Sequence, residues 1–303
     1  MIRIGTRGSE LALWQARKIA ARIRELTGES PELSVITTRG DRIEDVPLTA
    51  ELGRSFFTKE IEEALLRDRI DLAVHSLKDL AVEQPRGLCL AAVVERISSR
   101  ERLLMRPEAV DREAEGDSGL PLGPRAVVGT SSPRRRRRLL ELRPDLRIKE
   151  LRGNVPTRVK KLEDGHYDAV LLACAGLERL GIRPAGLASV DLPEWLFPGA
   201  PGQGALGIQC RANDAELRGL LARIDDPTTA LLTRSERSLL AQLGGGCNLP
   251  LGCHCALRPE GGYRLAAFLF PASEEHASLS VHLSGEDPEA LATEAARTLG
   301  LAL

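Results

Sequence analysis

The sequence predicts an α/β protein with two similar, doubly wound βαβ domains and a small α+β domain at the C-terminal end. Two observations support this fold class: a strand–helix pattern that occurs twice, and a change of pattern from about residue 218. Repeated alternation of strands and helices is typical of parallel sheets covered by helices. A chain of 303 residues is long enough for two or three domains, each with its own core.

The first strand and helix of the repeated pattern begin near residue 2 and again near residue 126. IRIGTRGS (2–9) and AVVGTSS (126–132) are each an apolar strand, then Gly-Thr, then a serine placed to cap a helix. Pro133 directly follows the second serine, and proline is favoured as the first residue of a helix. Helices are therefore expected to begin at residues 10 and 133.

The remaining parts of the pattern also occur in pairs. LSVITTRGD (33–41) and LRIKELRGN (146–154) are predicted strands that end in Arg-Gly-Asp or Arg-Gly-Asn. Residues 61–79 and 159–177 each run from a helix through a short turn into an apolar strand. The order β-α-β-α-β thus occurs twice, which indicates two related domains with parallel sheets.

Glycine and proline divide the chain into its predicted domains. Residues 106–124 are predicted to be a loop, and residues 193–207, which hold four Gly and three Pro, are predicted to cross between domains. We expect domain 1 at 1–98 with 199–217, domain 2 at 99–198, and domain 3 at 218–303. In domain 3 the pattern predicts a helix at 215–243, strands near 251–258, 263–270 and 277–284, and a last helix at 288–299.

The composition is that of a globular protein from a reducing compartment. Apolar residues make up 43% and charged residues 28%, and no apolar run approaches the roughly 20 residues of a membrane span. The six cysteines form no C-x-x-C pair, and residues 1–20 do not resemble a signal peptide. The net charge of −1 provides no global attraction to nucleic acid. We therefore expect a cytoplasmic monomer that binds neither nucleic acid nor a membrane.

Arginines stand at equivalent strand ends and helix starts of the two predicted domains. Ligands of such sheets bind at the carboxyl ends of strands, where helix N-termini also favour anions. Cations at a helix N-terminus oppose its dipole, and arginine holds a carboxylate with two parallel hydrogen bonds, so a local anionic partner is indicated. No phosphate-binding glycine motif is present, which argues against a nucleotide. These arginines are Arg7, Arg134, Arg135, Arg152 and Arg158.

The run Arg134–Arg138 could also form a nucleic-acid surface or a solvated helix face. On a helix these five residues spread around the circumference, so only the first two can lie beside strand ends.

Asp79 follows the strand that ends near His75 and is the candidate catalytic carboxylate. It could form a structural ion pair with Lys78, or it could stabilise a cation and transfer protons at the mouth of a cleft. A lone histidine beside a strand, such as His75, is more often a hydrogen-bonded structural residue than a base.

Cys247 lies in the glycine-rich segment LGGGCNLPLG, which could leave its thiol accessible. It could be an inert loop cysteine, a covalent attachment point, or part of a metal site with Cys253, His254 and Cys255. The spacing fits no common zinc pattern, and a strand would place Cys253 and Cys255 on one face and His254 on the other. No metal is therefore expected.

Eight segments together closely resemble the porphobilinogen deaminase family, also called hydroxymethylbilane synthases. They follow the family order and cover nearly the whole chain: IGTRGSELALWQA, VITTRGD, HSLKDL, VGTSSPRRR, LRGNVPTR, YDAVLLACAGLERLG, PGQGALGIQCR and GGGCNLPLG. The resemblance implies two domains like the halves of periplasmic binding proteins. It also implies a transferase of porphyrin and heme biosynthesis, which condenses four porphobilinogen molecules into hydroxymethylbilane with loss of ammonia.

The resemblance further implies a dipyrromethane cofactor, held by a thioether to Cys247, and Asp79 as the catalytic acid. Asp79 would assist loss of the amino group and stabilise the resulting cation. The positions that match cofactor- and substrate-binding residues are Arg7, Ser9, Ser76, Lys78, Thr130, Ser132, Arg134, Arg135, Arg152, Arg158 and Gln203. Phe57 and Lys59 match the loop over the cleft, in which Arg54 replaces the lysine that the family often has. A two-domain binding protein for an anionic ligand, without catalysis, is the alternative class.

Overall fold

The computed structural model describes residues 1–42, 58–114, 116–245, 249–271 and 278–300. The chain divides into two compact units, Met1–Ile97 with Gly202–Asn248, and Ser98–Pro201 with Leu249–Leu303. Each unit is built around its own five-stranded sheet, and the second unit also carries a three-stranded sheet.

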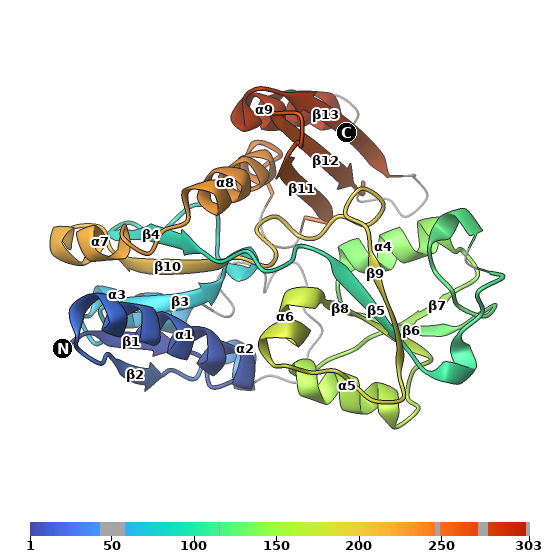
Figure 1. Ribbon diagram of the computed structural model, residues 1–303, viewed down its shortest axis with the longest axis horizontal. Coiled ribbons are helices and arrows are strands. Elements are labelled where there is room, and N and C mark those ends of the chain that lie inside the picture. Colours follow the sequence, from blue (N-terminus) through green and yellow to red (C-terminus); the bar gives the residue numbers. More distant parts are fainter. Residues whose placement is uncertain (43–57, 115, 246–248, 272–277, 301–303) are drawn as a thin grey trace. The chain divides into compact units, whose positions relative to one another are not determined.

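The sheet of the first unit has the order β2-β1-β3-β10-β4. Its strands are β1 (Arg3–Thr6), β2 (Glu32–Val35), β3 (Leu72–Ser76), β4 (Leu88–Val94) and β10 (Leu206–Arg211) (Figure 1). β1 lies parallel to β2 and to β3, whereas β10 runs antiparallel to both β3 and β4. A segment that follows the crossing at 202 thus completes a sheet begun by the N-terminal part of the chain.

Helices cover both faces of this sheet. Successive side chains of β3 point to opposite faces, and each face packs against a helix. Leu72 and Val74 pack in one core cluster with Ile19 of α1 (Glu10–Thr27). Ala73 packs on the other side with Leu65 of α3 (Lys59–Leu66). The carboxyl ends of β1 and β3 therefore lie side by side and close to the start of α1.

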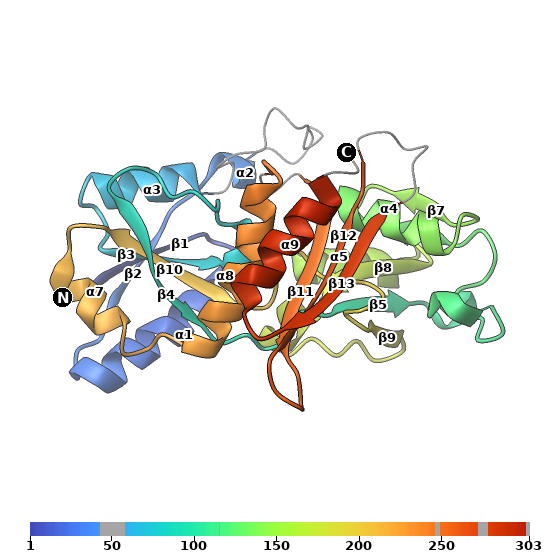
Figure 2. The ribbon, with the colours of Figure 1, turned by 90° about the horizontal axis from the view of Figure 1, so that it is seen from above.

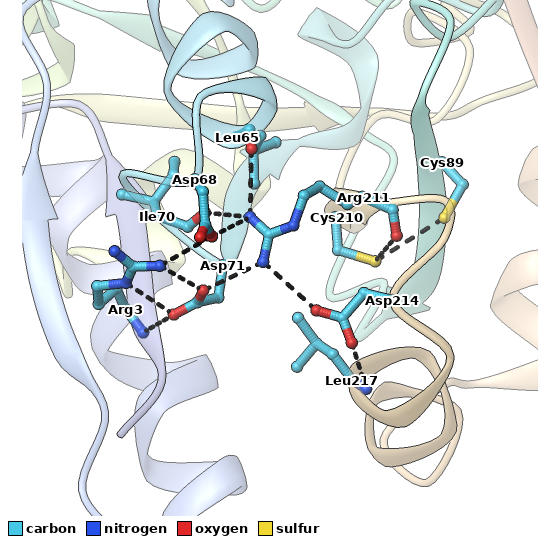
Figure 3. Close-up of polar contacts among 10 residues, drawn as sticks. All are labelled: Arg3, Leu65, Asp68, Ile70, Asp71, Cys89, Cys210, Arg211, Asp214 and Leu217. Atoms are coloured by element: carbon cyan, nitrogen blue, oxygen red, sulfur yellow. Dashed lines mark hydrogen bonds and ion pairs between the residues drawn. The ribbon is translucent and has the colours of Figure 1, made fainter.

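An ion cluster ties the opposite ends of these strands together, as Figure 3 shows. Asp71, just before β3, accepts hydrogen bonds from Arg3 at 2.8 and 3.0 Å and from Arg211 at 3.2 Å. The hydrogen bonds from Arg3 are the largest cause that lowers the pKa of Asp71 to about 2. Because β10 is antiparallel, its last residue reaches the beginnings of β1 and β3, and the cluster joins all three strands.

The five-stranded sheet of the second unit has the order β7-β6-β8-β5-β9. The strands are β5 (Glu101–Met105), β6 (Val127–Gly129), β7 (Arg147–Lys149), β8 (Ala169–Ala173) and β9 (Ala188–Leu192). Helices α4 (Pro133–Leu142), α5 (Val155–Glu163) and α6 (Cys174–Arg179) connect them. The strand β6 is parallel to β7 and β8, and β5 is antiparallel to β8 and β9.

The predicted internal repeat is confirmed, because both sheets place three parallel strands beside one antiparallel strand in the same order. The strand–helix alternation predicted parallel sheets, and the structure shows sheets with three parallel neighbours and an antiparallel fourth strand. In each unit the fourth strand enters from a chain crossing and runs against its neighbours. The fold class, two related α/β units with a small additional α+β part, is confirmed.

The C-terminal sheet of the second unit contains β11 (Leu251–Leu257), β12 (Tyr263–Leu269) and β13 (Leu279–Gly285), all antiparallel. α9 (Pro288–Gly300) packs across it, as Figure 2 shows. These elements lie within a few residues of the predicted ones. Cys253 and Cys255 are fully buried and His254 is partly exposed, which confirms their predicted distribution over the two faces of β11.

The arginine run of α4 holds this C-terminal sheet against the rest of the second unit. The guanidinium carbon of Arg138 lies 4.2 Å from the ring centre of Phe268, and Arg137 donates to the carbonyl of Pro271 at 3.0 Å. The amide of Cys253 also donates to the carbonyl of Gly199 at 2.9 Å. These two arginines therefore have a packing role inside the unit.

Two local predictions are wrong. The helix expected at 215–243 is two helices, α7 (Ala215–Leu221) and α8 (Pro227–Gln242), because Asp226 caps a new helix that begins with Pro227. Residues 39–42 form a short helix, α2 (Arg39–Arg42), instead of the end of a strand. In the described part of the chain, no helix has both the length and the apolar character of a membrane span.

The structure groups α7 and α8 with the first unit, and Leu217, Leu221 and Ile224 belong to its main core. The sequence pattern places residues 218–303 in one domain, and these three-domain boundaries stay a prediction.

Candidate active site

A cavity of about 90 Å³ lies in the first unit at the carboxyl ends of β1 and β3. Five residues singled out from the sequence line it: Arg7, Ser9, His75, Ser76 and Asp79. They come from two short segments that are far apart in the sequence, one after β1 and one at the end of β3. The parallel pairing of β1 with β3 brings them to one edge of the sheet.

Local structure explains how each group reaches the cavity. Ser9 caps α1 by accepting a hydrogen bond from the amide of Ala12 at 3.3 Å. After β3 the chain turns at once into the 3₁₀ turn η2 (Leu77–Asp79), and the fully buried Leu77 anchors that turn. Asp79 is therefore held three residues beyond the strand. Gln15 of α1 donates to the hydroxyl of Ser76 at 2.8 Å and fixes the strand end.

Lys78 and Gln203, two residues of the predicted site, form a hydrogen bond in the first unit. The ammonium of Lys78 donates to Oε1 of Gln203 at 3.1 Å, and Gln203 is fully buried. Next to them, the amide of Gly202 donates to the buried Glu236 at 2.8 Å. Arg96 pairs with the other oxygen of Glu236 at 2.8 Å and also donates to the carbonyl of Gln203. The crossing segment is thus tied to α8 through a buried ion pair.

His75 is a buried, hydrogen-bonded residue. Its side chain is 6% exposed, and its Nε2 lies 3.3 Å from Oε1 of Gln209 on β10. Burial, the largest cause, lowers its pKa to about 4, and the nearby charge of Arg7 acts in the same direction. The imidazole is therefore neutral at physiological pH.

In the second unit, Arg134 and Arg135 share one buried carboxylate, Glu101 at the start of β5. Arg134 contacts Oε1 at 2.5 Å, and Arg135 contacts both oxygens at 3.0 and 2.7 Å. A further N–H group of Arg134 donates to the carbonyl of Pro198, and one of Arg135 donates to the carbonyl of Leu171. The anionic partner that the sequence indicates for these arginines is thus, in part, a residue of the chain itself. The trio retains a net charge of +1.

The other predicted residues of this unit lie at strand ends and helix starts. Ser132 caps α4 and Asn154 caps α5 through their side-chain oxygens. The amide of Ser132 donates to the buried hydroxyl of Thr130 at 3.2 Å. Arg158 donates to the carbonyl of Gly153 at 2.7 Å, and Arg152 lies 3.9 Å from Glu150.

Several residues that organise these sites were not predicted from the sequence: Gln15, Arg96, Glu101, Gln209 and Glu236. The one available signal was the position of Gln209 inside an apolar strand segment, where a polar residue requires a buried partner. Cys247 and Phe57 lie outside the described residues. Lys59 begins α3. Among the described residues, no three His, Cys, Asp or Glu side chains gather as metal ligands.

A carboxylate and an arginine line the cavity of the first unit, and arginines stand at the helix starts of the second, which suits a protein that binds an anionic ligand. The chain matches the family model of the porphobilinogen deaminase, dipyrromethane cofactor binding domain over residues 2–219. Residues 230–300 match the porphobilinogen deaminase C-terminal domain. The chain belongs to the porphobilinogen deaminase family, which confirms the predicted family, enzyme class and dipyrromethane cofactor.

Curated relatives that match this chain over most of their own length are also named porphobilinogen deaminase. The porphobilinogen deaminase of Sulfurimonas denitrificans is 44% identical over 97% of this chain and 91% of its own. That of Phenylobacterium zucineum is 42% identical over 100% of this chain and 95% of its own. Among solved structures, an ancestral cationic amino acid solute-binding protein covers 80% of this chain and 90% of its own, at 12% identity and a TM-score of 0.43.

Proposed function

We propose that the protein condenses four porphobilinogen molecules into hydroxymethylbilane, with Asp79 as the catalytic carboxylate and Cys247 as the attachment point of the dipyrromethane cofactor. The observation that carries this proposal is the cavity that Asp79 shares with Arg7 and Ser9, in a member of the porphobilinogen deaminase family. Porphobilinogen, a small molecule with one acetate and one propionate, is the proposed substrate.

The residues around the cavity have complementary tasks. Arg7 can hold a substrate carboxylate through parallel hydrogen bonds, and the hydroxyl groups of Ser9 and Ser76 can orient it. Asp79 would then donate a proton as the amino group leaves, and its carboxylate would stabilise the positive charge that develops on the pyrrole. The same carboxylate would accept the proton that is lost when the new carbon–carbon bond forms.

The positive charges of the second unit are suited to the negative charge of the cofactor. Dipyrromethane is built from two porphobilinogen units and therefore carries several carboxylates. We propose that the net charge of Arg134, Arg135 and Glu101, with Arg152 and Arg158, holds them. The capped starts of α4 and α5 add helix dipoles of the same sign. When bound, the cofactor supplies a covalent primer, so that each intermediate need not be rebound.

Beyond the family, the cytoplasmic location, the monomeric state, and the lack of nucleic-acid and membrane binding stay predictions. Gel filtration with light scattering would test the oligomeric state directly.

The attachment point is tested by intact-protein mass spectrometry. We expect the purified protein to exceed its sequence mass by about two pyrrole units, and the Cys247→Ser variant to have its plain mass. The Cys253→Ser variant is the matched control and should keep the adduct, since Cys253 is fully buried in β11. An active wild-type protein at its plain sequence mass contradicts the proposal.

The role of Asp79 is tested by the Asp79→Asn variant. We expect ammonia release from porphobilinogen to fall by about 100-fold or more, the usual contribution of a positioned acid or base. The mass of the adduct and the melting temperature should be retained. Asp68→Asn is the control in the same unit, since Asp68 is 73% exposed and pairs at the surface with Arg3 and Arg211. Turnover within a factor of three of wild type in Asp79→Asn excludes the proposed role.

A further inference from the structure

A chain of polar side chains, three of them buried and one partly exposed, runs from the cavity into the interior of the first unit. It consists of His75 on β3, Gln209 on β10, Gln84, and Glu62 on α3, and we call it the Gln209 cluster. Gln209 is fully buried, His75 is 6% exposed and Glu62 is 5% exposed. Of these four residues, only His75 lines the cavity that also contains Asp79.

The Gln209 cluster lies where the core would otherwise be apolar. Glu62 is flanked on α3 by Ile61 and Leu65, which pack in the core with Ala73 of β3. Its Oε1 has no hydrogen-bond partner among the residues that the structure describes. Burial raises the pKa of Glu62, and the neighbouring amide of Gln209 opposes that shift. A buried polar group of this kind costs free energy, which indicates a role other than stability.

The hydrogen bonds of Gln209 select one tautomer of His75. The amide nitrogen of Gln209 donates to Oε1 of Gln84 at 2.9 Å, so its own Oε1 is the acceptor that faces Nε2 of His75 at 3.3 Å. A neutral imidazole must then carry its proton on Nε2 and leave Nδ1 as an acceptor. Gln84 is fixed in turn, because its amide donates to the carbonyl of Ala81 at 2.7 Å.

The charged groups around His75 come from three segments. Arg7 follows β1, and Asp79 belongs to η2 beyond β3. Glu62 of α3 interacts with Gln209, the hydrogen-bond partner of His75. On β10 its partner is the neutral Gln209. A proton on His75 would place a second cation in the cavity beside Arg7. That cation would compete for Asp79 with the positive charge that the reaction must develop on the pyrrole.

We propose that His75 is a positioning residue, which the Gln209 cluster holds neutral and protonated on Nε2 so that the charge of Asp79 remains available to the reacting pyrrole. This effect on rate rests on the proposed function, whereas the protonation state of His75 does not. The two parts can therefore be tested separately.

The first experiment follows the histidine side chains of the cofactor-bound protein by ¹⁵N–¹H NMR between pH 8 and pH 5. The chain has five histidines, and the signal that is missing in His75→Gln identifies His75. We expect His75 to keep the shifts of the neutral Nε2–H form throughout this range. Protonation of His75 with a midpoint above pH 5.5, or the Nδ1–H form, overturns the proposal. Because no turnover is measured, failure of the proposed function leaves this result intact.

The second experiment compares pH–rate profiles of Gln209→Glu and Gln84→Glu. Gln209→Glu places a carboxylate against Nε2 of His75 and should raise its pKa. We expect kcat at pH 6, relative to pH 8, to fall at least fivefold below the wild-type ratio. Gln84→Glu adds the same charge one residue further from His75 and should change the ratio less than twofold. Equal falls in the two variants overturn the proposal.

The double variant His75→Gln/Gln209→Glu assigns the effect to its titrating group. Glutamine cannot be protonated, so we expect the double variant to regain the wild-type ratio of kcat at pH 6 and pH 8. If the acidic fall in kcat persists without His75, the introduced carboxylate causes it and the proposal is wrong. If Gln209→Glu does not fold, the NMR titration of the wild-type protein decides the protonation state of His75. The pH–rate profile of His75→Gln then decides the effect on rate: we expect its ratio of kcat at pH 6 to kcat at pH 8 to stay within twofold of the wild-type ratio, and a larger change overturns that part of the proposal.

Discussion

Replacing Glu101 by glutamine would remove the buried carboxylate that Arg134 and Arg135 share inside the second unit. Glu101 is fully buried, and the two arginines are 6% and 7% exposed. Glutamine has nearly the same shape, so the change removes charge and one acceptor without leaving a cavity. The variant therefore isolates the electrostatic role of Glu101 from its packing.

The expected loss of stability follows from the contacts in the structure. Glu101 makes contacts of 2.5, 2.7 and 3.0 Å with the two guanidinium groups. Each pair of opposite charges contributes about 4 kcal/mol at an effective dielectric constant of about 20 and a charge separation of about 4 Å. Relief of the desolvation cost of the carboxylate offsets part of this sum. Breaking a buried ion pair on one side costs about 3–5 kcal/mol, and we expect a value in that range.

Urea and thermal unfolding, followed by circular dichroism, would measure this loss. Glu178→Gln is the matched control, because Glu178 is 37% exposed and lies 3.5 Å from Arg102 in the same unit. A partly exposed pair of this kind contributes at most about 1 kcal/mol. If the free energy of unfolding of Glu101→Gln lies within about 1 kcal/mol of that of the control, the buried charge of Glu101 does not stabilise Arg134 and Arg135, and the reasoning is refuted.

Two further predictions concern a glycine of the second unit and the ion cluster of the first. Gly153 has a φ of 107°, and an added Cβ would lie 2.7 Å from Thr157, so Gly153→Ala should destabilise the protein by about 1–3 kcal/mol. Gly219→Ala, which meets no atom within 4 Å in α7, should instead be neutral or slightly stabilising, and similar urea midpoints for both would contradict this account. Asp71→Asn should cost about 2 kcal/mol at pH 7, because the hydrogen bonds from Arg3 lower the pKa of Asp71 from 3.8 to about 2. That stability is present above pH 3.8 and is lost as the pH falls towards 2, so a difference from wild type that stays constant between pH 7 and pH 3 in urea unfolding would disprove the assignment.

The positions of the arginines show how tertiary contacts divide a run that is uniform in sequence. Arg134 and Arg135 turn towards Glu101, whereas Arg137 and Arg138 contact the aromatic rings of the C-terminal sheet. The helical period predicts that the five residues point in different directions. It does not predict which residue each arginine contacts, since β5 and β12 are distant from α4 in the sequence.

The internal repeat was evident from the sequence alone, because strand, cap and helix signals are local and occur twice in the same order. Local signals also placed Arg7, Ser9, His75 and Asp79 at strand ends, and the parallel pairing of β1 with β3 then predicts that they meet.

Only the tertiary structure determined the antiparallel fourth strand of each sheet, since β10 and β5 enter from crossings whose direction no local pattern fixes. It also determined that Glu101 pairs with two arginines and that Gln209 lies within hydrogen-bond distance of His75. Those contacts join residues 33 to 134 positions apart, and a buried charge or amide finds its partner by spatial proximity and not by spacing along the chain. The aspartate and the arginines could therefore be named from the sequence, whereas the buried residues beside them could not.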